Sequence, residues 1–62
     1  MDREFDRDEY VGLRYAEAHA HAIDRGWTPR RMVPGKVYTA ERDPDRLNLK
    51  TEGDIVVDAD LG

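Results

Sequence analysis

Two histidines are the first side chains of this 62-residue chain that could bind a metal. His19 and His21 lie two positions apart in an alanine-rich stretch. Residues two apart on a helix point to different sides, so these two rings cannot hold one ion together. We interpret both as solvated surface histidines and predict no metal site from them.

A cluster of oxygen-bearing side chains further along the chain resembles a calcium loop at first reading. Its members are Asp43, Asp45, Asn48, Glu52 and Asp54. An EF-hand needs a further oxygen ligand two residues after its second and then a glycine. After Asp45 those places hold Leu47 and Asn48. The spacing therefore predicts neither calcium nor any other cofactor.

The hydroxyl and thiol inventory argues against covalent catalysis. Serine and cysteine are absent, and the aliphatic hydroxyls belong to Thr28, Thr39 and Thr51. A nucleophile with an adjacent base and orienting group cannot be assembled from these residues. A domain of this length is also too small to enclose an ordinary substrate pocket. We predict that the protein is not an enzyme.

Length and charge point to one small domain. The net charge is −4, and residues 1–9 supply three of these charges with five acids against two bases. This segment is predicted to be a flexible N-terminal tail, or else a first helical turn, before a single domain at 10–62. The basic surface of a nucleic-acid-binding protein is missing. Oligomeric state does not follow from the sequence.

The sequence also carries no membrane or export signal. No apolar run approaches the ~20 residues that cross a bilayer. The N-terminus lacks the hydrophobic region of a signal peptide. We expect a soluble chain without membrane contact, either cytoplasmic or released from a processed precursor.

One long helix is predicted over Arg14–Arg25. Its alanines favour helix, and an apolar stripe runs down one side. The stripe consists of Tyr15, Ala18, Ala22 and Ile23. Arg14 stands where a capping box would have Ser or Thr, which predicts a weak start. Gly26 ends the helix, and Trp27 folds back as the largest core residue.

Three strands are expected to follow, at Thr28–Val33, Arg46–Thr51 and residues 55–61. Pro29 limits the first strand to a sheet edge or to a start one residue later, and Glu52-Gly53 is a hairpin signal. The connection of about a dozen residues between the first two strands permits a parallel pair. In the last strand, alternation predicts one buried face made by Ile55, Val57, Ala59 and Leu61. The fold class is α+β, one helix packed on a small mixed sheet with an exposed extended loop.

That loop and the strand after it carry a family resemblance. Gly35, the triplet Thr39-Ala40-Glu41 and the run Asp45-Arg46-Leu47-Asn48 resemble the potato inhibitor I type of serine protease inhibitors, nearest to the I78-type branch. Val11-Gly12-Leu13, Ala18 and Gly26-Trp27 are similar to that branch too. The resemblance covers roughly residues 10 to 62.

The resemblance implies a substrate-like inhibitor of a subtilisin- or elastase-like serine protease. The expected protease-binding loop consists of Val37, Tyr38, Thr39, Ala40, Glu41 and Arg42. The target bond would join Ala40 to Glu41, with the Ala40 methyl group in a small specificity pocket. Arg46 and Asn48 would support the loop, since the Arg46 guanidinium is a rigid fork able to bind loop carbonyls or the Glu41 carboxylate.

The alternative is a non-inhibitory interaction module on the same scaffold. Arg42 and Arg46 would then be ordinary surface charges, and Ala40 a small loop residue. The family often has a second arginine two residues after the first, where this chain has Asn48, as in the I78-type branch. Asparagine can bond the loop backbone but adds no charge.

Overall fold

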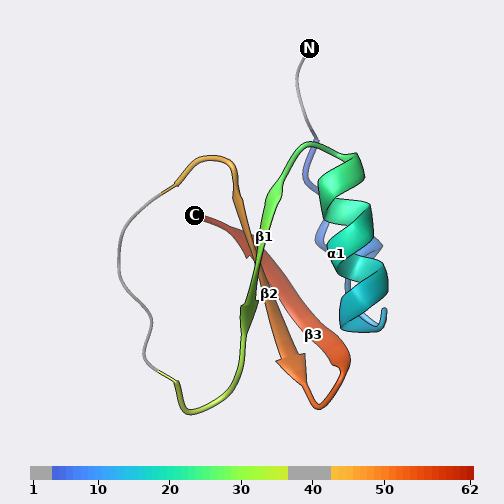
Figure 1. Ribbon diagram of the computed structural model, residues 1–62, viewed down its shortest axis with the longest axis vertical. Coiled ribbons are helices and arrows are strands. Elements are labelled where there is room, and N and C mark those ends of the chain that lie inside the picture. The colour runs from blue at the N-terminus through green and yellow to red at the C-terminus, as the bar shows by residue number, and fades with distance from the viewer. Residues whose placement is uncertain (1–3, 37–42) are drawn as a thin grey trace.

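The computed structural model describes residues 4–36 and 43–62. The described elements are a 3₁₀ turn at Arg7–Glu9, helix α1 at Tyr15–Asp24, and strands β1 at Thr28–Met32, β2 at Arg46–Glu52 and β3 at Ile55–Leu61. The strands form one sheet in the order β1-β2-β3, with β1 parallel and β3 antiparallel to β2. Helix α1 packs on one side of this sheet (Figure 1). The predicted α+β class, with one helix on a small mixed sheet, is confirmed.

Both ends of α1 follow from the residues that stand there. Arg14 occupies the N-cap position and makes no side-chain capping hydrogen bond, as the missing Ser or Thr predicted. Gly26 adopts a φ of +86°, which favours glycine, and the Trp27 amide donates to the Ala22 carbonyl at 2.9 Å. The chain therefore turns back at Gly26 and delivers Trp27 to the core.

Strand β1 lies at the sheet edge, where Pro29 can be accommodated without losing a ladder hydrogen bond. Its register with β2 pairs Thr28 with Arg46 and Met32 with Lys50. Parallel neighbours in register share a face, so these side chains lie on the face of the sheet opposite to Leu47. We call this side, which no described helix covers, the open face.

The predicted buried face of β3 is wrong except at Ala59, which is 3% exposed; Ile55, Val57 and Leu61 are 40%, 43% and 42% exposed. The strand contains a β-bulge, because Thr51 pairs with Val56 but Lys50 pairs with Asp58, so Val57 is the extra residue. Val56, which was expected to face outward, is fully buried. The bulge shifts the alternation by one residue, and Val57 leaves the helix side.

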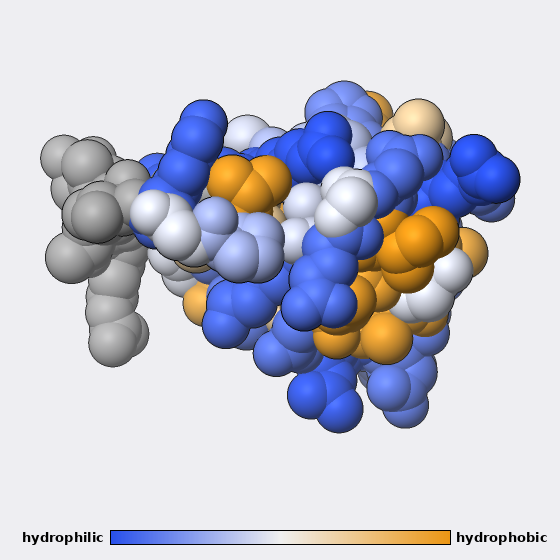
Figure 2. All heavy atoms as spheres, turned by 90° about the horizontal axis from the view of Figure 1, so that it is seen from below, coloured by the Kyte–Doolittle hydropathy of each residue, from blue (hydrophilic) through white to orange (hydrophobic). Residues whose placement is uncertain are grey.

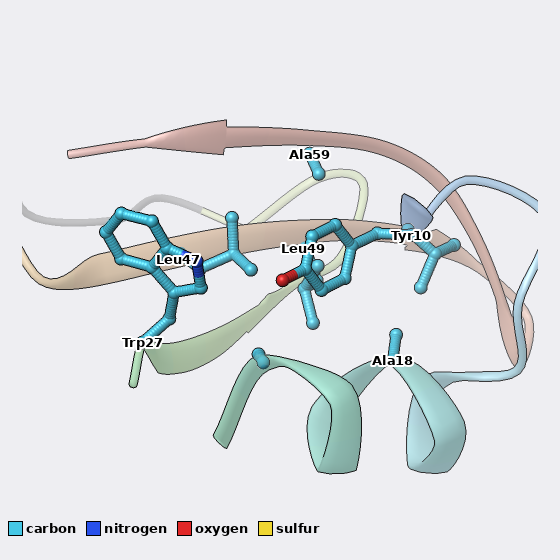
Figure 3. Close-up of a cluster of buried hydrophobic side chains, with 8 residues drawn as sticks. Tyr10, Ala18, Trp27, Leu47, Leu49 and Ala59 are labelled. Carbon is cyan, nitrogen blue, oxygen red and sulfur yellow. The ribbon is translucent and has the colours of Figure 1, made fainter. Parts of the chain in front are cut away.

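The core lies between α1 and the sheet. Leu47 and Leu49 sit between the rings of Trp27 and Tyr10, with Ala18 facing them from the helix (Figure 3). The fully buried alanines of α1 let the helix approach the sheet closely. Trp27 is buried as predicted. Ile23, which was predicted to belong to the apolar stripe of the helix, is 55% exposed, so the prediction is wrong there.

The segment before Tyr10 packs on this core. The Phe5 ring stacks on Tyr10 with 6.3 Å between centroids and meets Trp27 edge-on at 6.5 Å. The second of the two alternatives for residues 1–9, a helical turn, is found at Arg7–Glu9. Burial raises the pKa of the Tyr10 hydroxyl above its ordinary value of 10.0; the Glu9 charge raises it further and Arg25 opposes both.

The prediction that His21 is simply solvated is also wrong. Its Nε2 lies 2.9 Å from a Glu9 carboxylate oxygen, and the other oxygen of that carboxylate accepts from Arg25 at 3.1 Å. His19, by contrast, is exposed. Glu9 therefore fastens the N-terminal segment to the end of α1.

Candidate functional site

The stretch between β1 and β2 is the candidate site, and the structure describes its two ends. All six predicted loop residues, Val37 to Arg42, lie outside the described residues, as does the Ala40–Glu41 bond. The ends at residues 33–36 and 43–45, and the predicted supports Arg46 and Asn48, are described. The geometry of these ends determines what the connection can be used for.

The first end is a tight turn at residues 33–36. Pro34 stands second and Gly35 third, with a Gly35 φ of +84°, the residue pattern of a type II turn. The Lys36 amide lies 3.5 Å from the Val33 carbonyl and donates to it. The chain therefore leaves β1 with a fixed change of direction.

The second end is a turn closed by its own aspartate. The Asp43 carboxylate accepts from the Asp45 amide at 2.9 Å, and the Asp43 carbonyl accepts from the Arg46 amide at 3.1 Å. The Asp45 carbonyl then accepts from the Thr28 amide at 2.7 Å, at the start of β1. Asp43 and Asp45 thus have a structural role. The Asp43 side chain closes the turn by its hydrogen bond to the backbone two residues later, and the Asp45 carbonyl joins the turn to β1.

The Arg46 side chain is half-buried at the start of β2 on the open face. Its carbonyl accepts from the Gly62 amide at 3.1 Å, so its backbone lies between β1 and the last residue of the chain. Leu47 beside it is fully buried towards α1, which fixes the guanidinium stem on the opposite side. The predicted position of Arg46 on the polar face, at the return end of the connection, is therefore found.

Asn48 lies on the same face, two residues further, and is only 6% exposed. Its Nδ2 donates to an Asp60 carboxylate oxygen at 3.0 Å, which fixes the orientation of the amide. Its buried Oδ1 accepts no hydrogen bond from residues 4–36 or 43–62. A buried acceptor without a donor costs about 1–3 kcal/mol, so this oxygen is suited to a donor from outside the sheet.

Asp60 is the site residue that the sequence prediction missed. A regular hairpin continuing the pairs Glu52–Ile55 and Thr51–Val56 would place Ala59, not Asp60, opposite Asn48. The bulge after Thr51 shifts the register by one and brings Asp60 there. The sequence signal that could have indicated the bulge is the run Val56-Val57-Asp58, because its two adjacent apolar residues interrupt the alternation of apolar and polar residues along the strand.

The other candidate residues are not brought together. Asp45 and Glu52 lie at opposite ends of β2, so the acidic residues that suggested a calcium loop are dispersed along a strand. Within residues 4–36 and 43–62, no group of three or more His, Cys, Asp or Glu side chains could hold a metal. No helix in the same residues has the length and apolar character needed to span a bilayer.

Comparisons of this chain with known protein families, with curated proteins and with solved structures find no match. A functional proposal therefore rests on the chemistry of the residues and on the geometry of the two ends of the connection.

Proposed function

We propose that the protein inhibits a serine protease by presenting residues 37–42 as a substrate-like loop, with Ala40–Glu41 as the target bond. The observation that carries the proposal is the buried Asn48 amide on the return strand. Asp60 holds its nitrogen, and its oxygen is left for a donor outside the sheet. A backbone N–H of the connection is a donor of the required kind.

The two closed turns support the same proposal. The Pro34-Gly35 turn and the Asp43 turn each fix the direction of the chain at one end of the connection. A connection with fixed ends has fewer conformations to lose on binding, which lowers the entropic cost of association. It also keeps the new ends close after a cleavage, so that the peptide bond can form again.

Arg46 would supply the charged part of the support. Its half-buried guanidinium belongs to the first residue after the Asp43 turn, on the face that carries Asn48. A guanidinium offers several donors in one plane and can bond two carbonyls, or the Glu41 carboxylate, at once. Charge-assisted bonds of this kind contribute about 1.5–3 kcal/mol, and the lower end applies where solvent competes.

The target class follows from Ala40. A methyl group fills a small or shallow specificity pocket, as elastase-like and some subtilisin-like proteases have, and leaves a pocket built for a positive charge empty. Ala40→Lys should therefore create affinity for trypsin, and Ala40→Leu should favour proteases with larger apolar pockets.

The deciding experiment is a titration of subtilisin and of elastase with the intact protein at near-stoichiometric ratios. Residual activity is followed together with the mass of the added protein. Inhibition of either protease with the Ala40–Glu41 bond largely intact is the expected result. Rapid cleavage of the chain, or no effect on either protease and no trypsin affinity in Ala40→Lys, would contradict the proposal and favour a non-inhibitory interaction module.

A further inference from the structure

The open face has a second feature at its other end, a hollow of about 360 Å³ beside the β2–β3 hairpin. Met32 at the end of β1 and Val33 and Pro34 in the turn after it line the hollow, together with Val57 of β3. Figure 2 views the molecule from this end and shows apolar surface between charged side chains. The volume is at the lower end of the range of ligand pockets, ~300–1,000 Å³, and suits one anchoring group.

The bulge of β3 lies in the apolar lining. Val57 is the extra residue of this bulge, is 43% exposed and lines the hollow on the open face. Met32 and Val33 are half-buried beside it. An apolar hollow is thus built into the sheet rather than left by a missing side chain.

The charge around the hollow is basic in an otherwise acidic chain. Lys36 and Lys50, the two lysines of the sequence, both line it, and Glu52 is the acidic residue among the lining residues that the structure describes. Residues 28–36 carry three bases and no acid. Neither lysine has an ion pair in the described parts of the chain. By contrast, Arg7, Arg14 and Arg25 each lie within 4.0 Å of a carboxylate.

We propose that this hollow binds an extended acidic segment of a partner protein. One apolar side chain of the segment would enter between Met32 and Val57, and carboxylates on either side of it would meet Lys36 and Lys50. Charge complementarity selects this occupant, because the two lysines give the hollow a local positive charge in a chain whose net charge is −4. The lining residues that the structure describes do not include Arg46 or Asn48, so the proposal does not use the groups on which the proposed protease inhibition rests.

The test is a two-dimensional amide NMR titration of the ¹⁵N-labelled protein with three blocked pentapeptides. Glu-Glu-Phe-Glu-Glu is the probe. Glu-Glu-Ala-Glu-Glu lacks the apolar anchor, and Lys-Lys-Phe-Lys-Lys reverses the charge. The probe should shift the signals of Met32, Val33, Lys50 and Val57 but not those of α1, and the two controls should bind much more weakly. Absence of probe binding, equal binding of a control, or shifts centred elsewhere would overturn the proposal.

Variants then separate charge from shape. Lys36→Gln and Lys50→Gln should each weaken the probe by about two- to fivefold, the range of an exposed ion pair. Val57→Asp should abolish binding, while its circular dichroism shows that the fold is retained. Arg14→Gln removes one positive charge that does not line the hollow and is the matched control. Equal weakening by Arg14→Gln would show a general charge effect and overturn the local site.

Discussion

The two faces of the three-stranded sheet have opposite character. On the side of α1, Leu47, Leu49 and Val56 are fully buried, and the alanines of the helix close over them. On the open face, Arg46, Asn48 and Asp60 form a polar end, and the hollow beside Val57 forms an apolar end with two lysines. The same strands thus supply the core with one set of side chains and present binding groups with the other.

The opposite character of the two faces explains how a 62-residue chain without cysteine can have both a core and candidate binding surfaces. A domain of this size buries only ~60% of its unfolded surface, so every apolar residue that turns outward weakens the core. Here Ile55 and Val57 turn outward at the bulge, while Phe5 and Tyr10 add aromatic area from before α1. The N-terminal segment therefore adds buried apolar area to the core and compensates for the apolar side chains that lie on the open face.

The largest effect is expected from removing the core on the helix side of the sheet. Trp27→Ala should destabilise the protein by ~3–5 kcal/mol, because the indole is 6% exposed and contacts Phe5. Small domains have little more than this to lose, so most of the population should unfold. Thermal melting measures the effect. The control is Ile23→Ala, which should change the melting temperature little because Ile23 of α1 is 55% exposed. A Trp27→Ala protein that melts like the parent would show that the core is wrongly assigned.

On the open face, Arg46→Ala should change resistance to proteolysis more than stability. Loss of a charge-assisted bond at a half-buried site should cost about 1.5 kcal/mol, the lower end of its range. If Arg46 supports the loop, the variant should be nicked between Ala40 and Glu41 during hours with catalytic amounts of subtilisin. Mass spectrometry of variant and parent detects the nick.

Arg14→Ala is the matched arginine for this experiment, because its side chain is 72% exposed and away from the candidate site. It should resist subtilisin as the parent does. If Arg46→Ala and the parent resist equally and neither inhibits, Arg46 is an ordinary surface charge.

The Asn48–Asp60 pair can be examined with a double-mutant cycle. Asp60→Ala removes the acceptor of the Asn48 amide and should cost about 1 kcal/mol, since Asp60 is exposed to solvent. Asn48→Ala and the double variant complete the cycle, measured by urea unfolding. A coupling energy of zero would show that Asp60 does not orient the buried amide.

The smallest expected effect is a loss of stability at alkaline pH that depends on Tyr10. Its pKa is raised in the folded protein by burial, so the unfolded chain loses the hydroxyl proton first as the pH rises through about 10. Above that pH the unfolded state binds fewer protons, and stability should fall until the pH passes the folded pKa. Tyr10→Phe should remove this part of the decline in urea unfolding measured between pH 9 and about 11. An identical alkaline slope in parent and variant would contradict it.

Much of the fold could be predicted because it depends on local signals. Gly26 ends α1, Pro29 puts β1 at an edge, and the long connection allows the parallel pair. The position of Arg46 also followed, since a residue next to a buried leucine on a strand must face the other way.

Other features depend on pairings between residues distant in the sequence, and these required the tertiary structure. The run Val56-Val57-Asp58 does not by itself show which residue is the extra one in the bulge. The pairing with β2 decides this, and it also determines that Val56 is buried and that Asp60 lies opposite Asn48. His21 looked solvated because its partner Glu9 lies twelve residues earlier. Lys36 and Lys50 line one hollow only because the parallel pairing returns β2 beside β1. A sequence specifies each side chain and its local conformation, but which side chains meet depends on register, and one extra residue in a strand changes the register for all that follow.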